Sequence, residues 1–214
     1  MERGFPTLYI DQTLQTYLDD LASAKPAPGG GSAAAVSGAM SAALAAMVCQ
    51  LTLGKKKYAN VQDEIATLLQ EVESQRQHFQ QLMAADISAY SKLSACFKMP
   101  RETQEQSDAR TAAVQQSLVE AALVPLEMAE RALAVVRVCQ RVAEIGNTNV
   151  LSDIAAAAML AAGAGSSAAW MVRVNLTSLK DQETGAKLSH RLSLTLEELT
   201  NRCQQVAGIV GERA

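Results

Sequence analysis

Aromatic and metal-binding side chains are scarce in this sequence of 214 residues. Aromatic residues make up 4% of the chain, and the two histidines are His78 and His190. The four cysteines lie far apart, and no two of them form a CxxC pair. Zinc sites use clustered thiols and imidazoles, and disulfide frameworks belong to small secreted chains rich in cysteine. We therefore expect reduced cysteines in a cytoplasmic protein without a metal site.

Positive charge is not in excess either. The formal net charge is −3 and no basic stripe is visible, so nucleic acid is not an expected partner. Charge is nearly absent from residues 26–54 and 145–172, where Asp153 is the one exception. Both stretches are long enough to span a membrane, but Ala, Gly and Ser dominate them and gain little from lipid. We expect two helices buried in protein, and no membrane partner.

Helical periodicity runs through almost the whole chain, with apolar residues at spacings of three and four. The predicted helices cover residues 11–24, 32–53, 61–97, 103–144, 152–176 and 181–209. Pro125 is expected to kink or divide the fourth helix, and Gly185 to disturb the last. No alternating strand pattern and no linker interrupts them. The sequence predicts an all-α fold, a single domain over 1–214 built from long, partly kinked helices.

Three consecutive glycines, Gly29, Gly30 and Gly31, precede Ser32 at the start of the second predicted helix. Glycine permits unusual backbone angles and lets a ligand approach the main chain closely. A helix start also presents unpaired N–H groups and partial positive charge, which suit an anion or a polar ring edge. Ser32 is expected to cap this helix. A flexible turn that ends in a capping serine explains the same residues equally well.

Two carboxylates occupy unusual positions. Asp86 shares the apolar stripe of helix 61–97 with Leu82 and Tyr90. An unpaired carboxylate is costly there, so Asp86 either caps another helix or has the raised pKa of a catalytic acid or base. Tyr90, one turn further on, is placed to share its site. Asp153 is the sole charge between Glu144 and Arg173, yet the first turn of a helix favours an acidic residue in any protein.

A run of three lysines, Lys55, Lys56 and Lys57, precedes Tyr58 where the glycine-led helix ends. Cations are favourable near a helix C-terminus, so a solvated surface run is the simpler interpretation. The alternative is a docking site for the anionic tail of a ligand.

These features together resemble the formiminotetrahydrofolate cyclodeaminase and methenyltetrahydrofolate cyclohydrolase family, which includes the C-terminal domain of formiminotransferase-cyclodeaminase. The similarity covers nearly the whole chain in order. The segments that carry it are Pro26 to Ala35, Gly54 to Tyr58, Asp86 with Tyr90, Val124-Pro125-Leu126 with Ala129-Glu130, Gly146-Asn147 through Ser152-Asp153, and Asn175-Leu176.

The resemblance implies an all-helical, intertwined homodimer that acts on a folate, possibly polyglutamylated, without a further cofactor. The implied reaction closes 5-formiminotetrahydrofolate to 5,10-methenyltetrahydrofolate and releases ammonia. Alternatives are methenyltetrahydrofolate cyclohydrolase and a non-catalytic folate-binding or scaffold protein. The chemistry needs an acid and a base, and Asp86 and Asp153 are the candidates. The expected substrate-binding residues are Gly29, Gly30, Gly31, Ser32, Lys55, Lys56, Lys57, Tyr58, Tyr90, Asn147, Asn149 and Asn175.

Overall fold

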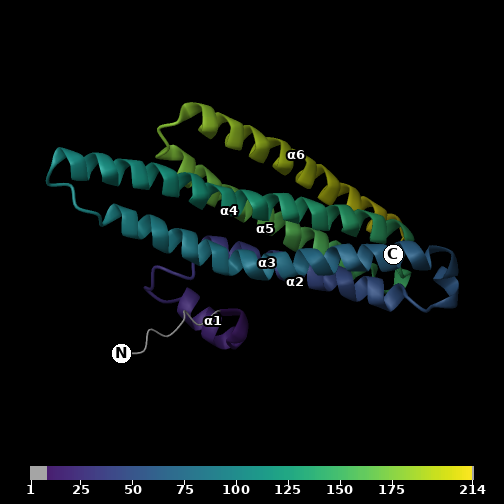
Figure 1. Cartoon of the computed structure of the whole chain (residues 1–214). Coiled ribbons are helices and arrows are strands. Elements are labelled where there is room, and N and C mark those ends of the chain that lie inside the picture. Colours follow the sequence, from purple (N-terminus) through teal and green to yellow (C-terminus); the bar gives the residue numbers. More distant parts are fainter. Residues whose placement is uncertain (1–8, 214) are drawn as a thin grey trace.

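The structure, a computed structural model, describes residues 9–213. All regular secondary structure in this part of the chain is helical, which confirms the all-α prediction (Figure 1). The α-helices are α1 (Leu14–Leu21), α2 (Gly30–Thr52), α3 (Gln62–Phe97), α4 (Gln104–Ile145), α5 (Leu151–Thr177) and α6 (Gln182–Arg213), and short 3-10 helices cover Tyr9–Asp11, Lys56–Val61 and Thr148–Val150.

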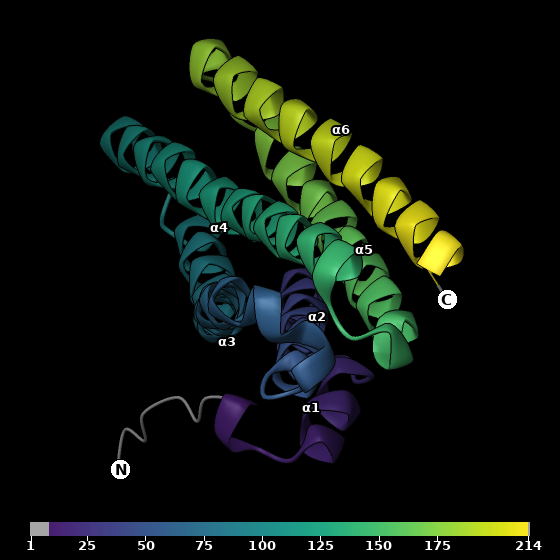
Figure 2. The same ribbon diagram turned by 90° about the vertical axis from the view of Figure 1, so that its right-hand side faces the viewer.

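Helices α2 to α6 pack against one another along their lengths, and the short α1 lies below α2 and α3, joined to the core through Tyr17 (Figures 1 and 2). Helix α2 packs between α3 and α5, and α4 covers all three. Helix α6 packs on α4 and α5. The glycine-led start of α2 therefore lies among α3, α4 and α5, and this placement positions the candidate site.

Small side chains bring α2 and α5 close together. The hydroxyl of Ser41 donates to the carbonyl of Ala157 at 2.6 Å, and Ser37 donates to Leu160 at 3.2 Å. By length and composition both helices could cross a membrane, yet their apolar windows are 56% and 44% buried within the protein. We expected both helices to be buried in protein. Each is buried along one side only, and its other side faces outward.

Helix α4 runs through Pro125 undivided, so of the two outcomes expected there, a kink or a division, the division is wrong. Proline has no N–H to donate to the carbonyl four residues earlier, which here belongs to Ala121. The side-chain amide of Asn175 on α5 donates to that carbonyl at 2.9 Å. Asn175 therefore supplies the hydrogen bond that Pro125 cannot make. The disturbance expected at Gly185 is also not observed, because α6 continues through it.

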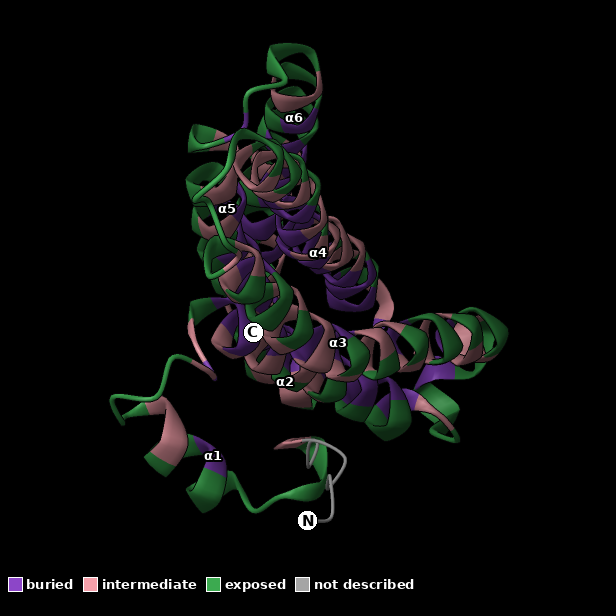
Figure 3. Cartoon of the chain, turned by 60° about the vertical axis from the view of Figure 1, so that its left-hand side comes forward, coloured by how far each residue is buried: buried purple, intermediate pink, exposed green. Residues whose placement is uncertain are grey.

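The first predicted helix is shorter than expected, and its apolar face is mostly uncovered. Of its apolar residues at helical spacing, Tyr17 is buried in the core, whereas Leu14 and Leu18 are exposed. Most of α1 is accordingly drawn as exposed or intermediate (Figure 3).

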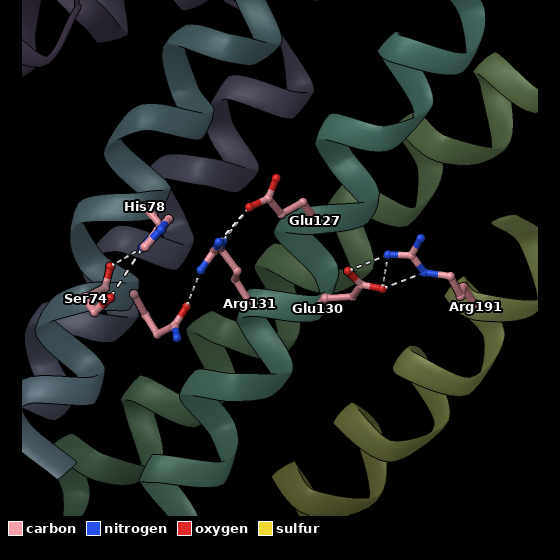
Figure 4. Close-up of polar contacts among 7 residues, drawn as sticks. Ser74, His78, Glu127, Glu130, Arg131 and Arg191 are labelled. Carbon is pink, nitrogen blue, oxygen red and sulfur yellow. Dashed lines mark hydrogen bonds and ion pairs between the residues drawn. The ribbon is translucent and has the colours of Figure 1, made fainter. Parts of the chain in front are cut away.

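Ion pairs link the outer helices. Glu130 on α4 accepts three hydrogen bonds from Arg191 on α6 (Figure 4). Arg131 on α4 donates to Glu127 on the same helix and to Gln75 on α3. Exposed pairs of this kind contribute up to about 1 kcal/mol each, so they align helices more than they stabilise them. Glu130, part of the family-like motif on α4, therefore joins two helices.

The Pro125–Asn175 pairing predicts a non-additive effect on stability. Asn175→Ala leaves the Ala121 carbonyl without its partner and should cost about 1–3 kcal/mol of unfolding free energy in urea titrations. In a Pro125→Ala background the restored N–H should remove about 1 kcal/mol of that cost. An equal cost in both backgrounds would show that the two residues are not coupled.

Candidate functional site

A cavity of about 380 Å³ lies where α2 begins, between α3 and α5. Side chains and backbone from four helices and the preceding loop line it, and most of them are apolar. Among the residues described, Asp86 is the one charged side chain in this lining. The lining residues are Pro26, Ala27, Gly29, Gly30, Gly31, Asp86, Ile87, Ala89, Tyr90, Leu93, Ala121, Met171, Val174 and Asn175.

Asp86 lies on α3 directly against the first turn of α2. Its carboxylate faces the backbone N–H of Ser32, which acts to lower the pKa of Asp86. A Cβ atom at Gly31 would overlap the carboxyl group of Asp86. The carboxylate can approach the positive end of α2 this closely because position 31 has no side chain.

Burial raises the pKa of Asp86 above its ordinary value, and the Ser32 N–H opposes the shift without cancelling it. The charged form of Asp86 is therefore less favourable in the folded protein than in water. The sequence allowed two interpretations of Asp86, a helix cap or a carboxyl group of raised pKa. The structure supports the raised pKa, and the nearby start of α2 offsets part of the cost of the charge.

The glycine run works differently from the expectation. None of Gly29, Gly30 and Gly31 has a positive φ, and in the described chain Gly54 alone does. A Cβ atom added at Gly29 would meet nothing within 4 Å. A Cβ atom added at Gly30 would lie 3.4 Å from the flexible end of the Met171 side chain. The expectation of unusual backbone angles is therefore wrong, and the close approach of Asp86 to Gly31 is the steric reason for one glycine of the three.

Ser32 was expected to cap α2, and this expectation is wrong. The helix already begins at Gly30, with Gly29 as its N-cap residue. Its hydroxyl is fully buried and lies 3.2 Å from the hydroxyl of Tyr17. Burial raises the pKa of Tyr17, the bond to Ser32 lowers it, and the charge of Asp86 raises it further. Sequence analysis missed Tyr17 as a member of this site, although it was the aromatic residue on the apolar face of α1.

Asn175 and Tyr90 complete the cavity end as predicted. Both amide hydrogens of Asn175 are used, by the carbonyls of Ala121 and Met171 at 2.9 Å each. Its side-chain oxygen is left as an acceptor for a ligand. Tyr90 is 45% exposed in the lining, one helical turn from Asp86. The apolar residues Ile87, Met171 and Val174 were not anticipated. Met171, four residues before Asn175 on α5, is the one that helical spacing could have indicated.

The remaining predicted residues gather at the opposite end of α2. Tyr58 lies under Lys57 and accepts a hydrogen bond from the Thr148 N–H at 2.9 Å. These contacts lower the pKa of Tyr58 although burial acts to raise it. Asn147 is buried, and its amide donates to the Leu51 carbonyl while its oxygen accepts from the N–H of Asn149. Asn147 therefore holds the loop together and has little capacity left for a ligand.

One protomer keeps the two candidate carboxylates apart. Asp153 begins α5, whereas Met171 of the same helix lines the cavity that holds Asp86. Met171 lies eighteen residues after Asp153 on α5, so about 27 Å of helix separates Asp153 from the cavity. Asp86 and Asp153 of one chain therefore cannot act together on one folate bridge, and the predicted acid/base pair is not assembled within a protomer.

The steric contact at Gly31 predicts a sharp difference between neighbouring glycines. Gly31→Ala should displace Asp86 and lower kcat by roughly 10²-fold, the usual scale for losing an acid or base. Gly29→Ala meets open space and should retain most of the activity. Steady-state kinetics of the two variants, with circular dichroism to confirm folding, measures the difference. Equal losses would show that the Gly31–Asp86 contact does not matter.

Comparisons with known proteins identify the family. The family model for formiminotransferase-cyclodeaminase matches residues 13–194. A methenyltetrahydrofolate cyclohydrolase from Methylorubrum extorquens is 43% identical over 173 residues, which cover 80% of this chain and 83% of that protein. The formimidoyltransferase-cyclodeaminase of Rattus norvegicus is 31% identical over 204 residues, which span 95% of this chain but 38% of the rat protein.

A solved structure shares the whole architecture. The crystal structure of formiminotetrahydrofolate cyclodeaminase from Thermotoga maritima superposes with a TM-score of 0.87 at 27% identity and covers 95% of this chain and 98% of that one. The matched region contains the glycine-led helix, Asp86 and Asn175. Sequence, fold and cavity thus lead to one conclusion: the chain belongs to the formiminotransferase-cyclodeaminase family.

Proposed function

We propose that this chain is a folate-dependent one-carbon enzyme that hydrolyses the methenyl bridge of 5,10-methenyltetrahydrofolate. The observation that carries the proposal is Asp86, the one charged side chain described in a mostly apolar cavity. The bridge is a cationic amidinium, and a carboxylate in a partly dry pocket attracts such a group strongly. A volume of about 380 Å³ suits a small-molecule ring system.

The choice of hydrolysis over deamination rests on similarity. The stand-alone relative at 43% identity is a methenyltetrahydrofolate cyclohydrolase, and this likeness reverses the order expected from sequence. Cyclodeamination of 5-formiminotetrahydrofolate is the second candidate, favoured by the fold shared with the Thermotoga maritima cyclodeaminase. Both reactions pass through a carbon held between N5 and N10, so the same site serves either.

In the proposed hydrolysis a water molecule adds to the bridging carbon while Asp86 accepts one of its protons. The C–N5 bond then breaks, and N5 takes up the proton that Asp86 accepted. The new hydroxyl group on the carbon loses its proton to solvent, which leaves a formyl group on N10 and releases one proton overall. The raised pKa of Asp86 suits this role, because it makes the carboxylate a stronger base than a free one. Asn175 offers an acceptor for a polar edge of the pterin.

The assay that tests the reaction follows the absorbance of the methenyl bridge. The purified protein should consume 5,10-methenyltetrahydrofolate with a larger kcat/KM than it forms this compound from 5-formiminotetrahydrofolate. The reverse ratio would establish the cyclodeaminase instead. Binding of folate without turnover of either compound would return the chain to the third alternative, a non-catalytic folate-binding or scaffold protein.

Asp86→Asn should separate a catalytic role from a structural one. It should lower kcat by roughly 10²-fold or more. The wild-type rate should fall on the acid side with an apparent pKa above the ordinary carboxyl range, and the variant should lose that limb. The protonated carboxyl favours the folded state, and this contribution is lost as the pH rises through the raised pKa. The variant should therefore keep its thermal stability at neutral pH, or gain some.

The control for this prediction is Asp63→Asn, an exposed carboxylate on the same helix. It should change neither kcat nor the acid limb. If Asp86→Asn instead unfolds the protein and keeps its activity per folded molecule, the carboxylate is a structural cap.

A further inference from the structure

One hydrogen bond closes the stretch of chain that leads into the cavity. The hydroxyls of Tyr17 on α1 and Ser32 on α2 lie 3.2 Å apart, although 15 positions of sequence separate the two residues. The loop between them carries Pro26 and Ala27, which line one side of the cavity. Within α1, all of which the structure describes, Tyr17 is the one buried residue. Its side chain is therefore the main attachment of α1, and of the loop that follows, to the start of α2.

The hydrogen bond between these hydroxyls is buried at both ends. The Tyr17 side chain is 5% exposed and belongs to the hydrophobic core, and Ser32 is fully buried. Within residues 9–213 the Tyr17 hydroxyl is the one hydrogen-bond partner of the Ser32 hydroxyl. A buried hydroxyl that loses its partner pays the full cost of its desolvation. Each of the two groups therefore holds the other in place.

Ser32 also connects Tyr17 to Asp86. Its backbone N–H faces the Asp86 carboxylate, and the missing side chain at Gly31 lets that carboxylate come close. The charge of Asp86 acts on the Tyr17 hydroxyl, which requires the two groups to be near each other. Tyr17 is not among the described residues that line the cavity, so it reaches Asp86 from outside the substrate space. The three residues form a continuous series from α1 through α2 to α3.

We propose that Tyr17 is a positioning residue for Asp86: its hydroxyl fixes Ser32 and the first turn of α2, and its ring keeps water away from the carboxylate on the side outside the cavity. Tyr17 does not contact the substrate in this role and acts only through its neighbours. Its effect on turnover rests on the proposed function, whereas its effect on the environment of Asp86 does not.

Tyr17 acts without a charge of its own. Burial is the main reason that its pKa is raised above the ordinary value, so its hydroxyl stays protonated while Asp86 titrates. The described cavity lining from the loop, α2, α4 and α5 has no charged side chain, and Tyr90 on α3 is its other titratable group. Hydrogen bonding and the exclusion of water are thus the means by which Tyr17 influences Asp86.

Kinetics of hydroxyl-deletion variants test the connection through Ser32. Tyr17→Phe keeps the buried ring and should lower kcat about fivefold, the scale of one neutral hydrogen bond, with KM little changed. Ser32→Ala should cause a similar loss, and the double variant should lose no more than either single one. The matched control is Tyr9→Phe, which removes a tyrosine hydroxyl that donates to Asp20 at 2.7 Å and should keep wild-type kcat.

Two kinetic results would overturn this positioning role. One is wild-type kcat in Tyr17→Phe, which would make its hydroxyl irrelevant to the reaction. The other is a double variant in which the two losses multiply, because independent effects show that Tyr17 does not act through Ser32. Circular dichroism of each variant confirms that the compared proteins are folded.

A titration of the Asp86 carboxyl group tests the shielding, whatever reaction the protein catalyses. Tyr17→Ala removes the ring, so water should reach the carboxylate and the midpoint, followed by carbon-detected NMR, should fall toward the ordinary carboxyl range. Leu18→Ala, at an exposed residue of α1, is the control and should leave it unchanged. An unchanged midpoint in folded Tyr17→Ala would refute the shielding, and if this variant does not fold, the Tyr17→Phe kinetics decide. A lowered midpoint in a protein that turns over neither folate compound would refute the proposed function and support the role of Tyr17.

Discussion

The close contact between Asp86 and the first turn of α2 is the interaction on which the rest of the site depends. It needs a carboxylate from α3, a free N–H at Ser32 and the absence of a side chain at Gly31. The N–H and the helix start make the charged carboxylate tolerable, whereas burial keeps its pKa raised. The result is a carboxylate that is not fully solvated and that has no cation beside it in the described lining of the cavity. Tyr17 supports it from behind through the hydroxyl of Ser32.

The opposite wall of the cavity is set by a proline in a helix. Pro125 frees the carbonyl of Ala121, and Asn175 crosses from α5 to take it up. The same hydrogen bond fixes the orientation of the Asn175 amide, so its oxygen is the atom left for a ligand. The missing N–H of Pro125 thus joins α4 to α5 through the Asn175 side chain.

The sequence predicted the helices well because periodicity reports which side of each segment is apolar. It also identified Asp86, since a carboxylate in such a stripe is costly. It could not show that Asp86 and Asp153 lie at opposite ends of one chain, because periodicity gives faces and says nothing about which helix ends meet. The role of Gly31 was hidden for a similar reason. Three glycines look alike in a sequence, and only the approach of α3 distinguishes them.

The continuity of α4 shows the same limit. Proline in a helix predicts a break when its freed carbonyl has no partner. Asn175 lies 50 positions away from Pro125, so the compensating hydrogen bond becomes visible only when α4 and α5 are packed. The membrane-like length of α2 and α5 was likewise ambiguous. Their inner sides pack in the protein, and their outer sides face outward.

The central claim is that Asp86 is a carboxylate of raised pKa, poised for a cationic folate bridge. The most direct measurement is a carbon-detected NMR titration of the Asp86 carboxyl group, assigned by comparison with Asp86→Asn. The account predicts a midpoint above the ordinary carboxyl range in the free protein, because burial disfavours the charge. It predicts a lower midpoint when a non-hydrolysable cationic analogue of the methenyl compound is bound, because opposite charge stabilises the carboxylate. A midpoint in the ordinary range, unchanged by the analogue, would contradict the account.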